Sequence, residues 1–242
     1  MDKKEYSKVL YTLFKKELVS YFNSPIAYIF IGTFLIVGNW LFFSSFFLVG
    51  QASLRGYFSI LPWFFLFLIP AIAMRLWAEE KKTGTIEFLL TLPVTDWQVV
   101  LGKFFGALAF VCVILILTLS LPITISFLGD FDWGVAAGAY LGSLFLAGAY
   151  LALGLFISSL TKNQIVAFVL SLAGSFLFFI VGTDFVVAKS PRLIQLVMSF
   201  LGLGSHFGNI AKGVIDSRDI FYYLSFIFFF LWLNKRIVEK RN

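Results

Sequence analysis

Charge, cysteine and histidine are all scarce in this sequence of 242 residues. Asp, Glu, Lys and Arg make up 13% of the chain, whereas soluble domains carry roughly 25%. Apolar residues reach 60%, and the sequence contains 32 Phe. A soluble fold cannot hide so much apolar surface behind so few charges. The composition therefore indicates a polytopic membrane protein.

The scarce residues exclude several kinds of chemistry. Cys112 is the single cysteine, so the chain forms no internal disulfide, and His206 is the single histidine, which excludes a multi-histidine metal site. We interpret His206 as a polar loop residue rather than a catalyst. The sequence also lacks the Gly-x-x-x-x-Gly-Lys-Ser/Thr phosphate loop, so it cannot bind and split ATP by that route. We expect a chain that is not an enzyme and carries no metal or cofactor of its own.

Five long apolar runs and a shorter sixth predict six transmembrane helices. The first five are each long enough to cross the hydrocarbon core, which takes about 20 residues. The sixth reaches that length only if it continues past Lys235 and Arg236, whose long stems can snorkel. The predicted spans are 26–50, 57–77, 104–128, 135–160, 164–187 and 220–237. The predicted fold is all-α, with a single transmembrane domain over residues 1–242.

Lys and Arg are distributed unevenly about these spans. If both termini are cytoplasmic, 14 basic residues lie on the cytoplasmic side and 5 on the other, which together account for all 19. This bias satisfies the positive-inside rule, so the net charge of +6 orients the chain. No basic stretch is interleaved with exposed aromatic residues, so we expect no nucleic-acid partner. The cytoplasmic set comprises Lys3, Lys4, Lys8, Lys15, Lys16, Arg75, Lys81, Lys82, Lys103, Lys162, Lys235, Arg236, Lys240 and Arg241.

Residues 5–22 precede the first span and show a helical period. Apolar residues recur at steps of three or four, while Lys8, Lys15 and Lys16 lie off that stripe. The pattern predicts an amphipathic helix lying in the cytoplasmic interface of the bilayer, either as a plain anchor or as an aid to docking a partner. The stripe comprises Tyr6, Val9, Leu10, Leu13, Phe14, Leu18, Tyr21 and Phe22.

Residues 78–98 join the second span to the third on the predicted cytoplasmic side. Lys81 and Lys82 suit the negative end of a helix dipole, and Gly84 can supply the turn that ends the helix. Thr95 and Gln98 have the spacing of a capping box that starts the next helix, and Thr161 and Gln164 repeat it before the fifth span. The pattern alone indicates a compact, structured loop.

The motifs of this region resemble those of ABC-2 type transporter permeases. Ala78-Glu79-Glu80, Gly84-Thr85-Ile86-Glu87-Phe88-Leu89-Leu90, Leu92-Pro93-Val94 and Leu101-Gly102-Lys103 occur in the order that the family shows. Within the family, Ser53–Glu80, His206-Phe207, Gly213–Asp216 and Arg218-Asp219 are similar to the permeases of gliding-motility and copper-enzyme-maturation transporters. The resemblance covers nearly the whole chain.

This resemblance implies a type V exporter-like permease fold and a set of partners. The loop between spans two and three becomes the coupling segment that inserts into a separate ATP-binding subunit, where ATP is held. The candidate contact residues carried over are Glu79, Glu80, Gly84, Thr85, Glu87 and Pro93. A second permease chain completes a homodimer or heterodimer, and the resemblance leaves room for an auxiliary subunit with an extracytoplasmic domain. The location implied is the bacterial cytoplasmic membrane.

Residues 188–218 form the longest segment on the outer side, too long for a turn. Ser190-Pro191 opens an apolar stretch that glycines bound, which predicts a short re-entrant or interfacial helix pair, a feature that the family carries at this place. Backbone that is not helical is tolerated there only where protein or water covers it.

Three other functions stay open as alternatives. An ion-coupled secondary carrier usually holds a buried ionisable group, and no Asp, Glu, Lys or Arg lies near the middle of any predicted span. A membrane enzyme needs a catalytic cluster that one His and scattered acids do not supply. A scaffold subunit without transport has no sequence feature that separates it from a permease. Small-residue repeats such as Gly134, Gly138 and Gly142 are typical of close helix packing.

Overall fold

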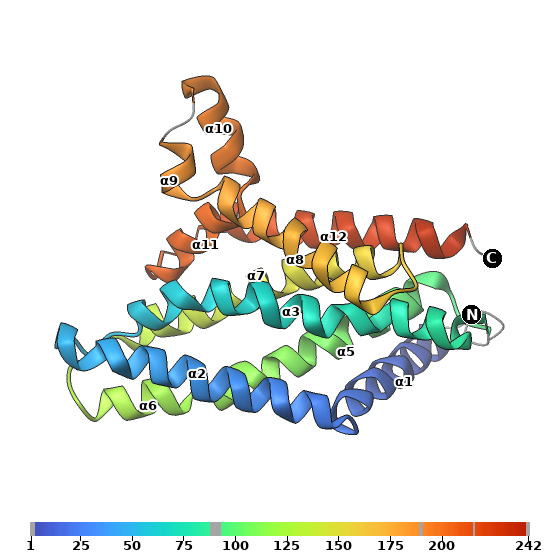
Figure 1. The fold of residues 1–242 in the computed structure, drawn as a ribbon, viewed down its shortest axis with the longest axis horizontal. Coiled ribbons are helices and arrows are strands. Elements are labelled where there is room, and N and C mark those ends of the chain that lie inside the picture. The colour runs from blue at the N-terminus through green and yellow to red at the C-terminus, as the bar shows by residue number, and fades with distance from the viewer. Residues whose placement is uncertain (1–2, 88–92, 189–190, 215, 241–242) are drawn as a thin grey trace.

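A computed structural model describes residues 3–87, 93–188, 191–214 and 216–240. Within these ranges the regular secondary structure is α-helical, and six helices are long and apolar enough to cross a membrane. They run side by side along the longest axis of the molecule (Figure 1). The prediction of an all-α polytopic membrane protein is confirmed. The spans are α2 (Pro25–Val49), α3 (Arg55–Thr83), α5 (Asp96–Leu117) with α6 (Ser120–Ser126), α7 (Trp133–Ser158), α8 (Gln164–Val181) and α12 (Ser217–Glu239).

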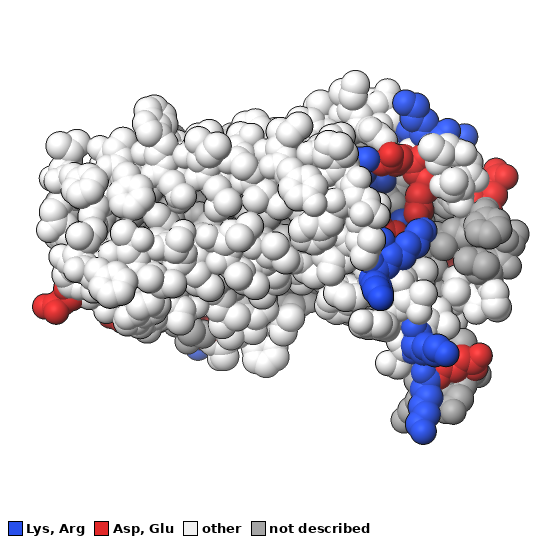
Figure 2. All heavy atoms as spheres, turned by 90° about the horizontal axis from the view of Figure 1, so that it is seen from below, with Lys and Arg blue, Asp and Glu red and all other residues white. Residues whose placement is uncertain are grey.

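Charge is concentrated at one end of this bundle. Both chain termini lie at the same end in Figure 1. Figure 2 shows Lys, Arg, Asp and Glu gathered at that end, whereas the rest of the visible surface is almost free of them. We call this the charged end, and the end that holds the turn between α2 and α3 the opposite end.

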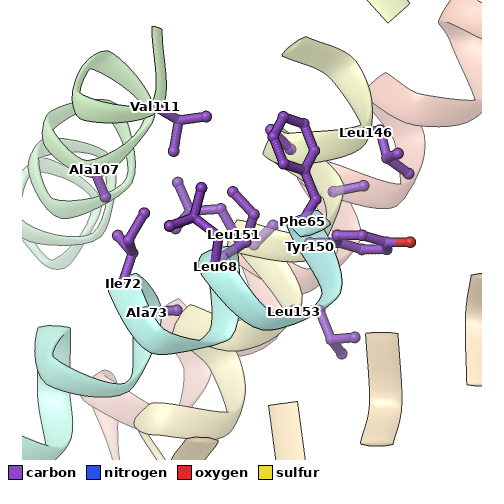
Figure 3. Close-up of a cluster of buried hydrophobic side chains, with 14 of the residues drawn as sticks. Phe65, Leu68, Ile72, Ala73, Ala107, Val111, Leu146, Tyr150, Leu151 and Leu153 are labelled. Carbon is purple, nitrogen blue, oxygen red and sulfur yellow. The ribbon is translucent and has the colours of Figure 1, made fainter. Parts of the chain in front are cut away.

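Helix α7 forms the centre of the bundle and packs against α3, α8, α11 and α12. Its glycines allow close approach: a Cβ on Gly154 would lie 2.6 Å from the Cβ of Ala73, and one on Gly142 would lie 2.6 Å from Cγ2 of Ile210. Leu146, Tyr150, Leu151 and Leu153 of α7 meet buried residues of α3 and α5 in the core (Figure 3). Gly142 and Gly154 therefore serve packing inside the chain.

The capping box at Thr95 sets the start of the third span, and Pro122 accounts for its bend. Thr95 and Gln98 form the predicted capping box, so α5 starts at Asp96, eight residues before the predicted span. The span breaks between α5 and α6 because Pro122 has no N–H to donate to the carbonyl of Thr118. That carbonyl accepts instead from the N–H of Leu121 at 2.9 Å and from the hydroxyl of Tyr140 at 3.1 Å.

The fifth span is shorter than predicted. α8 ends at Val181 rather than continuing to residue 187, and the chain turns at Gly182 into α9 (Asp184–Val187). The N-cap of α8 is Asn163, whose side chain accepts from the N–H groups of Ile165 and Val166. The prediction of a Thr161 capping box is wrong at this helix, because the amide of Asn163 lies closer to the free N–H groups.

Two helices follow α9 in the segment predicted as a re-entrant pair. They are α10 (Arg192–Leu201) and α11 (Leu203–Ala211). Figure 1 shows α9 and α10 projecting from the side of the bundle, whereas α11 returns to it and packs against α7 and α8. Gly202, between α10 and α11, touches Gly182: a Cβ on Gly202 would lie 2.0 Å from the Cα of Gly182. Only glycine at both positions permits this contact between main chains.

The amino-terminal helix α1 (Lys3–Phe22) lies against α5 at the charged end. All eight residues of the predicted apolar stripe are partly buried, and Lys8, Lys15 and Lys16 are exposed. The helical period of residues 5–22 therefore identified the packed face correctly. Part of the stripe is covered by protein, since Tyr21 stacks on Phe110 of α5 with ring centroids 4.9 Å apart.

Candidate functional site

A buried lysine joins three helices at the charged end. The Nζ of Lys103 lies 2.7 Å from Oε1 of Glu80 and 3.0 Å from Oε1 of Glu17, and its side chain is only 2% exposed. Glu80 belongs to α3, Glu17 to α1 and Lys103 to α5. The ammonium also lies over the ring of Trp77, 4.9 Å from its centroid. A buried cation needs such partners, because an unpaired one would lose several kcal/mol of solvation. We call Glu17, Glu80 and Lys103 the ion triad.

Glycines on α5 let α1 approach closely enough to form the triad. A Cβ on Gly106 would lie 2.6 Å from the Cβ of Glu17, and one on Gly102 would lie 2.8 Å from the Cβ of Leu13. One turn nearer the start of α5, the side-chain amide of Gln98 donates to the carbonyl of Tyr6 at 3.1 Å. The Leu101-Gly102-Lys103 motif thus combines a close helix contact with the charge that the contact buries.

A second ion pair lies beside the triad. Arg75 donates to Glu79 at 2.9 Å, one turn along α3, and to the hydroxyl of Ser24 at 3.1 Å. The Ser24 side chain therefore accepts from Arg75 and forms no cap hydrogen bond with α2. The pair links the end of α3 to the junction between α1 and α2.

The two groups share a small cavity of about 150 Å³. Three cations and three carboxylates line it, so their formal charges cancel. The phenol of Tyr21 donates to the carbonyl of Ile72 at 3.3 Å. Burial raises the pKa of Tyr21 well above its usual range, which keeps the phenol a neutral donor. The lining residues are Lys16, Glu17, Ser20, Tyr21, Arg75, Leu76, Glu79, Glu80 and Lys103.

The same end of α3 is fixed to α7 by polar contacts. The hydroxyl of Ser158 lies 3.2 Å from the N–H of Trp77 and 3.1 Å from that of Ala78, and it donates to the carbonyl of Met74 at 3.0 Å. Lys81 is also buried and donates to the carbonyl of Ser159. Motion of the end of α3 must therefore act on α1, α5 and α7 together.

The structure divides the predicted contact residues into two groups. Glu80 turns inward to Lys103 with its side chain 17% exposed, whereas Glu79 pairs with Arg75 and stays 40% exposed. Thr85, Glu87 and Pro93 are exposed. Gly84 is also exposed and ends α3 with a φ of 75°, the left-handed conformation that glycine tolerates. Residues 88–92 of the predicted coupling segment lie outside the described residues.

Sequence analysis identified Glu80 and Lys103 only as parts of separate motifs and overlooked Glu17. One feature of the sequence indicates a buried lysine. Lys103 lies between Gly102 and Gly106 in a run that is otherwise apolar, where an exposed lysine is not expected. The identity of its partners depends on the packing of α1, which the sequence did not give.

A second polar cluster lies at the start of α12, away from the charged end. Nδ1 of His206 is 2.6 Å from Oδ1 of Asp219, and its Nε2 is 3.0 Å from the carbonyl of Phe200. The carbonyl of Phe200 can only accept, so Nε2 is the donor in that contact. His206 also stacks on Tyr222 with centroids 4.0 Å apart. The histidine thus connects α10, α11 and α12.

Neither cluster has the composition of a metal centre. Among the described residues, no group of three or more His, Cys, Asp and Glu side chains is placed to hold a metal ion. The triad pairs its carboxylates with ammonium groups, and the second cluster offers one His and one Asp. The arrangement at the charged end suits the transfer of movement between helices, through charges that cannot be separated cheaply.

Comparison with known proteins identifies the family. The profile described as "ABC-2 family transporter protein" matches residues 14–229 of the chain. A comparison with curated proteins found no match. The matched range contains all three members of the ion triad and the described part of the loop between α3 and α5. With its six apolar helices, the chain belongs to the ABC-2 family of transporter proteins as a multi-pass membrane permease.

Proposed function

We propose that the chain is the permease subunit of an ATP-driven transporter, energised by a separate ATP-binding subunit that docks on the loop between α3 and α5. The observation that carries this proposal is the direct linkage between that loop and the packed bundle. Glu80 and Gly84 lie four residues apart at the end of α3, one inside the ion triad and the other at the exposed turn. A displacement of this turn is therefore transmitted to α1 and α5 through the ion triad.

The exposed residues around Gly84 form the proposed docking surface. Lys82, Thr83, Thr85 and Glu87 are exposed on one side of residues 88–92, and Pro93 on the other. Ile86 between them is buried, which anchors the turn to the bundle. The surface thus presents polar contacts on a supported backbone, as a transmitted movement requires.

The charged end faces the cytoplasm in this proposal. The positive-inside rule places the basic side there, together with both termini. The proposed setting is the bacterial cytoplasmic membrane, with two permease chains, homologous or identical, over two ATP-binding subunits. The motifs at His206-Phe207 and Arg218-Asp219 support assignment to the gliding-motility and copper-enzyme-maturation branch, and an auxiliary extracytoplasmic subunit completes the proposed assembly.

The first test is purification of the tagged full chain from its host in mild detergent. We expect an ATP-binding polypeptide to accompany it in fixed stoichiometry, with ATPase activity. Reproducible recovery of the intact chain alone would contradict the proposal and favour a secondary carrier or a scaffold.

A second test locates the docking surface by crosslinking. Cys112 is replaced by Ser, and Thr85→Cys is compared with Asp130→Cys, an exposed residue at the opposite end. We expect a crosslink to the ATP-binding subunit from position 85 only. A crosslink from position 130, or from neither position, would overturn the proposed surface.

A third test separates docking from coupling. Proline cannot adopt the positive φ of Gly84, so Gly84→Pro should abolish stimulation of the ATPase while the chain still inserts into the membrane. Glu87→Lys should weaken association, whereas the matched charge reversal Asp130→Lys should leave both properties unchanged. Normal coupling in the Gly84→Pro variant would show that the segment is assigned wrongly.

A further inference from the structure

An apolar groove with two cations among its lining residues lies at the opposite end of the bundle. It has a volume of about 520 Å³ and is formed by α3, α8 and α11, with Lys212 directly after α11. This volume falls within the range of small-molecule sites, roughly 300–1,000 Å³. Phe58, Pro62, Phe179 and Phe207 line its walls.

Small residues on α11 keep the groove open. Gly204, Gly208 and Ala211 all line it. A Cβ on Gly208 would meet no atom within 4 Å, so no side chain of the protein fills the space beside it. Gly204, in contrast, is required for packing, since its Cβ would lie 2.7 Å from the carbonyl oxygen of Phe179. The groove therefore widens at Gly208, between its apolar walls.

Two of the residues that line the groove carry positive charge. Arg55 and Lys212 line the groove from α3 and from the end of α11, and both are exposed. Within the described residues neither forms an ion pair. Asp130 and Asp132 line a neighbouring cavity that Arg55 also borders, and Oδ1 of Asp132 accepts from the N–H groups of Gly134 and Val135.

Helix electrostatics do not account for both cations. Lys212 follows the last residue of α11, where a positive charge suits the helix dipole. Arg55 is the first residue of α3, where the dipole disfavours a cation, and the first turn of α3 contains no acidic residue. An anion bound between Arg55 and Lys212 would stabilise the positive charge of both side chains.

We propose that this groove binds an anionic phospholipid of the bilayer. Its apolar walls suit an acyl chain, and Arg55 and Lys212 suit the phosphate of the headgroup, to which a guanidinium can donate two hydrogen bonds. The groove lies at the start of α3, one of the six helices long and apolar enough to cross a membrane. Basic pockets between membrane helices on the cytoplasmic side bind anionic headgroups, and the proposal extends that chemistry to the opposite end. The inference does not depend on the ATP-binding partner.

Native mass spectrometry of the purified full chain tests this site with added phosphatidylglycerol and phosphatidylethanolamine of the same acyl chains. We expect preferential binding of phosphatidylglycerol. The paired change Arg55→Gln with Lys212→Gln should lower its affinity at least about tenfold and remove the preference. The matched pair Lys82→Gln with Lys162→Gln, exposed cations at the charged end, should change neither.

Two further arms examine the groove itself. Gly208→Leu fills the open space and should reduce retention of both lipids, while the charge variants retain phosphatidylethanolamine. Inorganic phosphate alone should not displace the bound lipid, because the acyl chain supplies part of the binding. Equal binding of the two lipids to the unaltered chain, unchanged preference in the Arg55 and Lys212 variant, or displacement by phosphate would each overturn the proposal.

Discussion

Lys103 of α5 and Glu80 of α3 form a buried ion pair. The loop at the charged end joins these two helices. The two side chains meet at 2.7 Å, and their neighbour Glu17 brings the amino-terminal helix to the same point. The pair unites the Ala78-Glu79-Glu80 and Leu101-Gly102-Lys103 motifs, which are separate in the sequence. A displacement of either motif is therefore transmitted to the other.

Removal of the cation should be costly. Lys103→Met leaves Glu17 and Glu80 facing each other without a buried counter-charge, and breaking a buried pair typically lowers the free energy of unfolding by about 3–5 kcal/mol. Denaturant unfolding of the purified chain in mixed micelles measures this loss. The matched change Lys162→Met alters an exposed residue and should cost little. Equal losses in the two variants would contradict a structural role for the triad.

The contact between α1 and α5 should be sensitive to one added methyl group. At Gly106, Ala would place a Cβ 2.6 Å from that of Glu17, and such overpacking costs roughly 1–3 kcal/mol. At Gly32 of α2, a Cβ meets nothing within 4 Å, so Ala should stabilise the helix by up to about 1 kcal/mol. Thermal unfolding of the two variants should therefore shift in opposite directions. A gain in stability for Gly106→Ala would show that α1 does not pack there.

Two buried serines should differ in their importance. Ser158 bonds to backbone groups of α3, whereas Ser143 donates only to Ala139 in its own helix. Hydrogen bonds between membrane helices contribute about 0.6 kcal/mol on average. Ser158→Ala should lower the free energy of unfolding by at least that amount, and Ser143→Ala should leave it almost unchanged. Indistinguishable effects would mean that Ser158 does not hold α3 to α7.

The contact between His206 and Asp219 should restrain α10 and α11. His206→Ala removes the bonds to both Asp219 and Phe200, and leaves a carboxylate that is 6% exposed without its partner. Hydrogen exchange of the amides in α10 and α11 should increase, while exchange in α7 stays slow. Asn209→Ala, at an exposed position of α11, serves as the control. Unchanged exchange in the His206 variant would assign the restraint to packing alone.

The number of spans could be predicted from the sequence because each contains a long apolar run. The sequence also located the packed face of α1 and the cap at Thr95, both of which depend on residues close together in the chain. The end of α8 could not be predicted, since Val181 and Val187 are equally apolar and only the contact between Gly182 and Gly202 selects the turn.

The candidate site was predicted less completely for the same reason. Exposed positions such as Thr85 and Glu87 follow from their place in a polar loop. The inward orientation of Glu80 depends on a lysine 23 residues away, and that of Glu17 on one 86 residues away. Separations of this length are set by helix packing, which single-sequence patterns do not encode.

The order of the ion triad along the chain also bears on biosynthesis. Glu17 and Glu80 precede Lys103, so both carboxylates are synthesised before the ammonium that they surround. Folding during synthesis proceeds from the amino terminus. Both carboxylates are therefore already present when Lys103 is synthesised. Glu17, in contrast, has no Lys103 to pair with until the third span has been made. Helix α1 leaves the ribosome before α5 but reaches its final position only after α5 has been made.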